Sequence, residues 1–263
     1  MNECRICQIE TDLFDTVLVL KKYLVRYFLC KKCGCVQTEH PYWLDEAYSE
    51  AIAVQDTGVL SRNASSALML ETLLGVLFRA THRFLDFGGG YGILVRTMRD
   101  AGFDFYRLDK FCPNLFARGF DACLEPNQYF ECVTAFEVFE HLVDVIGTTE
   151  KLLRHTDSIL FSTFLLPRPT PKVADWWYYT PETGQHVTFY TTMALRALAR
   201  RFRLNLYSCG ATHLLTRKVV PSILFQALVH PRISWLIRSL PGRPHRKSLT
   251  HTDYERLSRE SRR

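Results

Sequence analysis

The chain has 263 residues, of which 47% are hydrophobic and 23% are charged. This composition excludes a disordered or collagen-like chain and leaves room for one large domain with a small appendage. The formal net charge of +6 is concentrated in residues 217–263, where eleven Lys or Arg residues stand against three Asp or Glu residues. The basicity therefore belongs to this C-terminal segment and not to the whole chain.

The first ten residues, MNECRICQIE, show neither the basic start nor the apolar run of a secretory signal. No apolar run approaches the roughly 18 residues that are needed to span a bilayer. We therefore expect a cytoplasmic protein without a transmembrane segment.

Four cysteines near the N-terminus form two C-x2-C pairs: Cys4, Cys7, Cys30 and Cys33. The pairs are separated by 22 residues, close to the usual spacing of zinc ligands, and the residues between them can supply hairpin strands. We therefore expect a zinc-ribbon-like module over residues 1–40. Four thiolates fill the tetrahedral shell of Zn²⁺, so the expected role of the metal is structural. Cys35 either replaces Cys33 as a ligand or stays free.

A helical linker or lid is expected over residues 41–80. Segment 42–52 follows a proline, and segment 65–78 places its apolar residues on one helical face.

Strand and helix patterns then alternate over residues 81–218. Apolar strands are expected at 83–87, 103–109, 130–136 and 158–166, helices at 93–102, 148–155 and 191–202, and a last strand at 203–208. Either Thr191 or Thr192 is the expected N-cap of the last helix. This alternation predicts an α/β fold, doubly wound around a mostly parallel sheet.

The basic segment 219–263 contains four prolines, at positions 221, 231, 241 and 244. Because proline interrupts helices, we expect short helices followed by a poorly ordered basic end. Trp235 and its apolar and basic neighbours have the composition of an amphipathic helix on a membrane surface, but the prolines favour a solvated end.

Residues 85–92, LDFGGGYG, gather four glycines behind an expected strand and before an expected helix. In such a unit, backbone N–H groups at the helix N-terminus face a ligand. Asp109 closes the second strand 21 residues after Gly88, where a carboxylate can accept hydrogen bonds from two ribose hydroxyls. Together these features predict a ligand that contains adenosine.

The glycine loop reads D-x-G-x-G-x-G, formed by Asp86, Gly88, Gly90 and Gly92. This spelling resembles the class I S-adenosylmethionine-dependent methyltransferases, which have a Rossmann-like fold. The resemblance implies that these four residues form the cofactor loop and that Asp109 binds the ribose. It also implies that Asp121 lies near the adenine.

Residues 133–141, VTAFEVFEH, look like the strand end and helix start that lie beside the transferred methyl group in this family. The resemblance places Phe136 at the cofactor and makes Glu137 a candidate catalytic residue. Glu140 and His141 fall in the same segment, where either could also be an ordinary residue at a helix N-terminus.

Residues 175–192 concentrate six aromatic side chains around His186. Aromatic rings can stack on a ring-shaped substrate, and a histidine can take up a proton near neutral pH. His186 is therefore the candidate general base. The alternative is an aromatic cluster that packs a loop around an ordinary hydrogen-bonded histidine.

A four-cysteine module, a methyltransferase core and the segment QHVTFY together resemble the zinc-containing methyltransferases of sugar and polysaccharide biosynthesis, including the deoxysugar C-methyltransferases. Those enzymes often carry a Glu-His pair, whose histidine removes a proton from the sugar. Here the pair reads Gln185-His186, and a neutral amide does not raise the basicity of the histidine as a carboxylate would. Glu182 is the candidate acid that compensates for the missing carboxylate of the Glu-His pair.

The resemblance implies methyl transfer to a carbon or oxygen of a sugar-like small molecule, such as a nucleotide sugar. One alternative is an RNA methyltransferase that binds its substrate through the zinc module and the basic segment. Another is a scaffold that binds the cofactor without catalysis.

Overall fold

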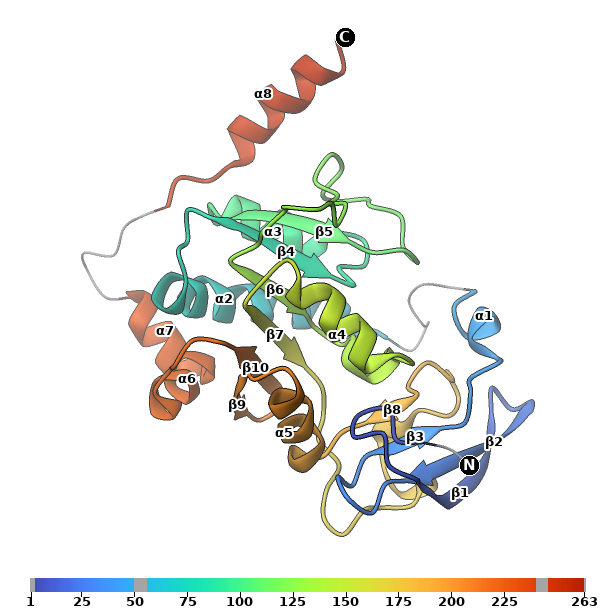
Figure 1. Ribbon diagram of the computed structural model, residues 1–263. Coiled ribbons are helices and arrows are strands. Elements are labelled where there is room, and N and C mark those ends of the chain that lie inside the picture. Colours follow the sequence, from blue (N-terminus) through green and yellow to red (C-terminus); the bar gives the residue numbers. More distant parts are fainter. Residues whose placement is uncertain (1–2, 50–55, 240–245, 263) are drawn as a thin grey trace. The chain divides into compact units, whose positions relative to one another are not determined.

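The computed structural model describes residues 3–49, 56–239 and 246–262 (Figure 1). The chain forms two compact units, each built from separate segments of sequence. The first unit comprises Met1–Val54, Phe136–Arg154 and Leu160–Arg217. The second unit comprises Gln55–Ala135, His155–Ile159 and Lys218–Arg263. The domain boundaries expected at residues 40, 80 and 218 stay predictions.

The larger sheet has the strand order β5-β4-β6-β7-β10-β9. Its strands are β4 (Arg83–Phe87), β5 (Asp104–Leu108), β6 (Cys132–Ala135), β7 (Ser158–Ser162), β9 (Asn205–Cys209) and β10 (Thr212–Thr216). Strand β4 pairs in parallel with β5 and β6, whereas β10 pairs antiparallel with β9. The predicted α/β fold with a mostly parallel sheet is confirmed. Strand β10 was not expected from the sequence.

Two helices of the second unit, α2 (Val59–Leu77) and α3 (Ile93–Asp100), cover the expected helical segments. Helix α3 begins directly after the glycine loop and ends before Gly102, whose positive φ of 83° suits a residue without a side chain. Helix α2 buries its apolar face and contacts α3 as well as two helices of the C-terminal segment.

The first unit contains a four-stranded sheet of order β1-β2-β3-β8. Its strands are β1 (Asp12–Val19), β2 (Tyr23–Leu29), β3 (Val36–Thr38) and β8 (Thr188–Phe189). The predicted hairpin between the cysteine pairs is formed by β1 and β2, which pair antiparallel. The last strand of the sheet comes from a segment about 150 residues downstream of β3. This pairing was not predicted from the sequence.

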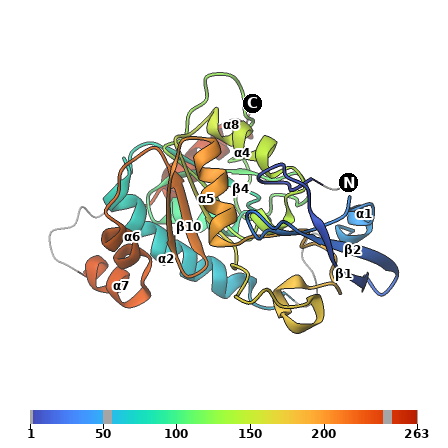
Figure 2. The same ribbon diagram turned by 60° about the horizontal axis from the view of Figure 1, so that its bottom comes forward.

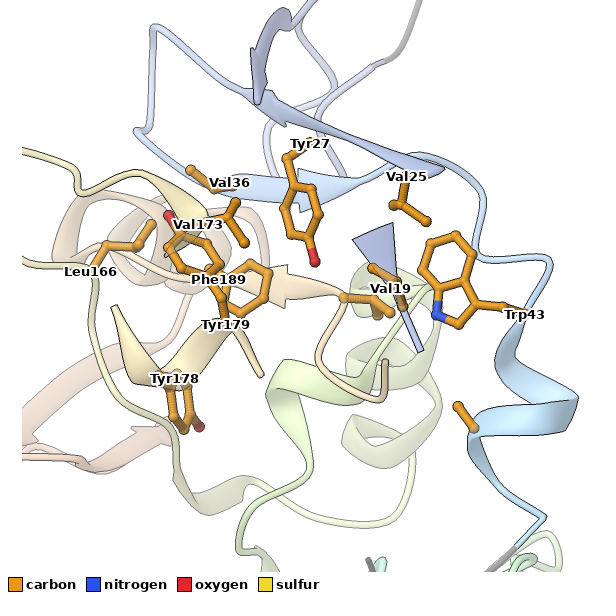
Figure 3. Close-up of a cluster of buried hydrophobic side chains, with 12 residues drawn as sticks. Val19, Val25, Tyr27, Val36, Trp43, Leu166, Val173, Tyr178, Tyr179 and Phe189 are labelled. Atoms are coloured by element: carbon orange, nitrogen blue, oxygen red, sulfur yellow. The ribbon is translucent and has the colours of Figure 1, made fainter. Parts of the chain in front are cut away.

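A hydrophobic cluster fills the first unit below this sheet (Figure 3). Tyr27 and Val36 from the sheet meet Tyr179 and Phe189 from the downstream segment, and all four side chains are buried. The ring centroids of Tyr179 and Phe189 lie 4.5 Å apart. Many of the aromatic residues expected at the site therefore belong to the core.

The other short elements of the first unit are α1 (Leu44–Ala47), η1 (Phe139–His141), α4 (Val145–Leu153), η2 (Val173–Asp175), η3 (Trp177–Tyr179) and α5 (Thr192–Arg201). Helix α1 is shorter than the expected helix at 42–52, of which residues 50–52 lie outside the described part. Thr191 is the N-cap of α5, because its hydroxyl accepts a hydrogen bond from the amide of Ala194 at 3.0 Å.

The described part of the C-terminal segment contains three helices: α6 (Ser222–Val229), α7 (Pro231–Ser239) and α8 (Thr250–Glu260). Helices α6 and α7 pack beside α2 (Figure 2). Pro221 and Pro231 stand at the N-termini of α6 and α7, where a missing amide hydrogen costs nothing, so they start helices instead of interrupting them.

The expected poorly ordered basic end is wrong for residues 246–262. Helix α8 buries Asp253, which forms a bidentate ion pair with the buried Arg99 of α3 at 2.7 and 2.8 Å. Burial of this pair fixes the helix on the second unit. Within the described residues, none of the helices has the length and apolar character to cross a bilayer.

Candidate functional site

The glycine loop lies between β4 and α3 in the second unit. Gly88, Gly90 and Gly92 all have positive φ values, of 71°, 52° and 86°, which L-residues with side chains rarely adopt. A Cβ atom on Gly92 would lie 2.7 Å from the Asn114 side chain, whereas a Cβ on Gly90 would meet no described atom within 4 Å. Gly92 is thus needed for packing, and Gly90 leaves its face of the loop open.

The side chain of Asp86 is buried below this loop. Its carboxylate accepts a hydrogen bond of 2.6 Å from the hydroxyl of Thr134 on the neighbouring strand β6. Burial, and then the charge of Asp109, raise the pKa of Asp86 to about 7. A Cβ atom on Gly89 would lie 2.7 Å from the Asp86 carboxylate, so this carboxyl packs directly against the loop.

Asp109 follows the end of β5 and holds two turns of the chain together. One carboxylate oxygen accepts a hydrogen bond from the amide of Gly90 at 2.9 Å. The other accepts from the amides of Phe111 and Cys112 at 2.7 and 2.9 Å. Asp86, Asp109 and the three glycines are therefore brought together as predicted.

Asp121 is connected to the glycine loop by Arg107. This arginine was not among the site residues predicted from the sequence. Arg107 is buried in β5 and forms an ion pair with Asp121 at 2.8 Å. Its guanidinium also donates to the carbonyl oxygens of Gly90 and Cys112. Arg107 thus joins the glycine loop to the segment after β5. A basic residue inside strand β5, two positions before Asp109, was the available signal.

Phe136 and Glu137 follow directly after β6 and begin a segment of the first unit. Phe136 is partly buried. Glu137 has a positive φ of 52° and is fixed by Ser162, whose hydroxyl donates to its carboxylate at 2.5 Å and accepts from its amide at 2.8 Å. The Glu137 carboxylate is therefore held in one place.

A buried acid and two histidines form a second cluster within the first unit. Glu140 and His141 lie in η1, and His186 precedes β8. The rings of His141 and His186 pack edge to face at 4.8 Å, and a Glu140 carboxylate oxygen lies 4.0 Å from Nε2 of His141. Each residue offers one ligand-type atom, and these atoms lie within 4.8 Å of one another.

Backbone carbonyls fix the histidine tautomers. Nδ1 of His186 lies 2.7 Å from the carbonyl oxygen of Tyr178. Because a carbonyl only accepts, Nδ1 carries the proton and Nε2 keeps its lone pair. Nδ1 of His141 contacts the carbonyl oxygen of Gln185 at 3.1 Å and the hydroxyl of Tyr48 at 2.8 Å. Burial lowers the pKa of His186 to about 4 and that of His141 to about 3.

Glu140 is the acid of this cluster. Its carboxyl is fully buried, and burial followed by the charge of Glu137 raises its pKa to about 8. Among the described residues, neither carboxyl oxygen meets a hydrogen-bond partner at normal geometry. A buried carboxyl without such partners is rare, and together with its raised pKa it makes Glu140 a candidate for a functional site.

The pair Gln185-His186 has a structural explanation. The side-chain amide of Gln185 donates a hydrogen bond of 2.8 Å to the carbonyl oxygen of Ala47. A carboxylate cannot donate this bond, so glutamine at this position fits the fold. The proposed compensating acid, Glu182, is exposed and makes no hydrogen bond to His186 in the part of the chain that is described.

Aromatic side chains near His186 divide into buried and exposed sets. Tyr178 is buried and packs its ring 4.6 Å from that of His186. Trp177 is 66% exposed, and its ring packs edge to face against that of Phe164, which is 42% exposed, at 5.1 Å. Trp177 and Phe164 therefore present aromatic surface to solvent.

The four predicted zinc ligands come together in the first unit. The sulfur atoms of Cys4 and Cys33 lie 3.5 Å apart and those of Cys7 and Cys30 lie 3.4 Å apart. Tetrahedral Zn²⁺ with bonds of about 2.3 Å separates its sulfur ligands by about 3.8 Å, so the four thiols fit this ion. Cys35 is buried outside this four-cysteine group, and its thiol faces the carbonyl oxygen of Val36.

Comparisons with known proteins found similarities to several solved structures. The plantazolicin methyltransferase BpumL, solved in complex with S-adenosylhomocysteine, is similar at 12% identity over 74% of this chain and 90% of that chain, with a TM-score of 0.47. CalO1, a methyltransferase in calicheamicin biosynthesis, is similar at 15% identity over 66% of this chain and 58% of that chain, with a TM-score of 0.43. This chain therefore spans less than two thirds of the length of CalO1.

Magnesium protoporphyrin IX methyltransferase from Synechocystis PCC 6803 is similar at 12% identity over 66% of this chain and 90% of that chain, with a TM-score of 0.41. None of the curated proteins matches the chain. The family model for a methyltransferase domain matches residues 61–208, more than half of the chain. The glycine loop and its acidic partner lie inside the matched region, and the chain belongs to the methyltransferase domain family.

Proposed function

We propose that this enzyme methylates a carbon or oxygen of a sugar-like small molecule or glycan precursor, with His186 as the general base. We further propose that it works in the cytoplasm in polysaccharide biosynthesis. The observation that carries the proposal is the Nε2 atom of His186, which is left unprotonated by the bond from Nδ1 to the Tyr178 carbonyl oxygen. A lone pair held in this way can accept a proton from an acceptor hydroxyl or C–H group.

The cofactor would be held by Asp86, Gly88, Gly90, Gly92, Asp109, Asp121 and Phe136. The open face of Gly90 and the carboxylate of Asp109 support this assignment, because both suit the close approach of a nucleoside. Bound S-adenosylmethionine supplies an electrophilic methyl group. The protein then has to hold the acceptor in line, exclude water and remove a proton.

The polar and aromatic groups of the first unit support the proposed acceptor class. Trp177 and Phe164 offer exposed aromatic faces on which a sugar ring can stack. Glu137, held by Ser162, offers a fixed carboxylate that can accept a hydrogen bond from an acceptor hydroxyl. Burial lowers the pKa of His186 to about 4, so its ring is neutral and its Nε2 lone pair is unprotonated throughout the physiological range.

Cofactor binding is tested first, by calorimetry with S-adenosylhomocysteine. We expect micromolar affinity for the wild type and at least a tenfold loss for Asp109→Ala, because the ribose loses its acceptor. Asp104→Ala, at the other end of β5, is the matched control and should bind normally. Equal affinities in Asp109→Ala and Asp104→Ala would contradict the cofactor assignment.

The base is tested with nucleotide-sugar acceptors. His186→Ala should lower kcat by 10²–10⁴-fold, the usual contribution of general base catalysis, and leave S-adenosylhomocysteine affinity unchanged. His213 is the matched control, because it is a buried histidine whose two ring nitrogens are both hydrogen-bonded. His213→Gln should lose stability but keep its kcat, and a kcat equal to wild type in His186→Ala would refute the assignment.

The group Glu140, His141 and His186 also has the composition of a metal site. If His186 transfers protons without a bound metal, a chelator that leaves the cysteine-bound zinc in place should not change kcat. An activity that requires added metal would instead favour a metal-bound role for the same three residues. Faster methylation of RNA than of nucleotide sugars would favour the RNA alternative.

A further inference from the structure

Helix α7 exposes its apolar residues and buries a polar one. Ser234 is 5% exposed, whereas Ile233, Trp235 and Leu236 are 40%, 62% and 57% exposed. Ser234 faces α2, where its carbonyl oxygen accepts a hydrogen bond from the hydroxyl of Thr72. A helix on the surface of a water-soluble domain normally buries its apolar residues and exposes its polar ones. The exposed apolar face of α7 therefore indicates that it contacts an apolar environment other than the core.

Two further apolar side chains are exposed in this segment: Val219, three residues before α6, is 88% exposed, and Ile223, in the first turn of α6, is 82% exposed. Helices α6 and α7 lie next to each other on α2 (Figure 2). Arg232, Trp235 and Leu236 are spaced i, i+3 and i+4, so they share one side of α7, and together with Pro231 they line an apolar pocket.

The charges of this segment indicate which kind of partner binds the exposed face of α7. Residues 217–252 contain seven Lys or Arg residues and no Asp or Glu. Lys218 is paired with Glu131, whereas Arg232 lies on the same side of α7 as Trp235 and Leu236. An apolar surface on a segment with an excess of positive charge is complementary to a bilayer with anionic headgroups, whose surface attracts Lys and Arg. A second copy of the chain on the same face would instead bring like charges together.

We propose that α6 and α7 dock on the surface of a bilayer that contains anionic lipids. Trp235 and Leu236 enter the headgroup boundary, where an indole ring is favoured because one edge is polar and the rest is apolar. Arg232, on the same side of α7, contacts lipid phosphates. This proposal does not depend on the identity of the acceptor or on the base.

The test is co-sedimentation of the full chain with vesicles of phosphatidylcholine, alone or with about one third phosphatidylglycerol. We expect the wild type to sediment with the mixed vesicles and to be released by added salt, because screening weakens the contribution of the basic residues. The double variant Trp235→Ser/Leu236→Ser should lose at least about tenfold in partitioning. Both side chains are exposed, so the double variant should fold normally.

Tyr254→Ser is the matched control, because Tyr254 is a 69% exposed aromatic residue on α8. It should partition like the wild type. S-adenosylhomocysteine affinity reports separately on the fold and on the methyltransferase assignment, so it should not change in either variant. The proposal is overturned if the wild type ignores anionic vesicles or if the double variant binds as well as the wild type. A wild-type dimer that dissociates in the double variant, without vesicle binding, would also overturn it in favour of a second copy.

Discussion

At the scale of single residues, the two acids Asp86 and Glu140 are similar in chemistry but differ in how well the sequence predicted them. Asp86 stands at a fixed place before the glycines, so its position below the loop follows from the motif. Glu140 was left open as a helix N-terminal residue, because its sequence neighbours do not reveal that its carboxyl is buried next to His141. The contact of His141 with His186 joins residues 45 positions apart, which no local pattern encodes.

Burial of Asp86 makes the stability of the fold depend on pH. Its pKa is raised from 3.8 to about 7, so the folded state binds more protons than the unfolded state between these values, and stability falls as pH rises through this window. Asp86→Asn removes this dependence. We expect the variant to gain on the order of 2–4 kcal/mol relative to the wild type between about pH 4 and about pH 8.

Urea unfolding of both proteins at the two pH values measures this difference. Glu125→Gln, which changes an exposed acid of the same unit, is the control and should follow the wild type. Parallel stability curves for the wild type and Asp86→Asn would show that Asp86 is not buried in the folded protein.

At the scale of elements, periodicity predicted the core strands and helices well. Strand β4 and helix α3 begin where their apolar patterns begin, and the first pattern ends at the glycines. Strand β8 has only two residues and no pattern of its own, so its pairing with β3 could not be predicted. Helix α8 was missed because its stabilising contact is an ion pair with Arg99, 154 positions away in the chain.

Helix α8 depends on that ion pair. Asp253→Ala leaves the buried Arg99 with Asp104 as its only acidic partner among the described residues, and breaking a buried pair costs about 3–5 kcal/mol. Detachment of α8 from the second unit would avoid part of this cost. We therefore expect fast amide hydrogen exchange over residues 250–260 and a lower Tm. Glu255→Ala, at an exposed position of the same helix, should change neither. Unchanged exchange in Asp253→Ala would mean that the other contacts of α8, among them the hydrogen bonds of Thr250 to Asp100 and of Arg256 to the Gly119 carbonyl oxygen, are sufficient to hold it.

At the scale of the whole molecule, the four candidate zinc-binding cysteines and the candidate base belong to one compact unit, and the glycine loop belongs to the other. Arg5, between the first two cysteines, donates to Thr188 and to the carbonyl oxygens of Thr38 and Glu39, so it connects the cysteine group to strand β8 beside His186. Damage at the cysteines should therefore affect catalysis more than cofactor binding.

Loss of zinc tests this division. Cys33→Ser should lose the expected single zinc ion per chain, and Cys35→Ser should keep it, because the sulfur of Cys33 and not that of Cys35 completes the group of four. In Cys33→Ser, kcat should fall at least tenfold while S-adenosylhomocysteine affinity stays within a few-fold of wild type. Metal analysis and calorimetry on the same samples measure both, and zinc retained in Cys33→Ser but lost in Cys35→Ser would reverse the ligand assignment.

The pairing of β3 with β8 also has a consequence for synthesis of the chain on the ribosome. Thr38 is translated about 150 residues before Thr188, an interval of roughly 8–30 s at ordinary elongation rates. During this time the cysteines can already bind metal, but Arg5 lacks its partner at Thr188 and the edge of β3 is unpaired. The nascent chain therefore exposes an incomplete sheet edge for many seconds, a period in which metal supply and chaperones decide how much of the protein reaches its folded state.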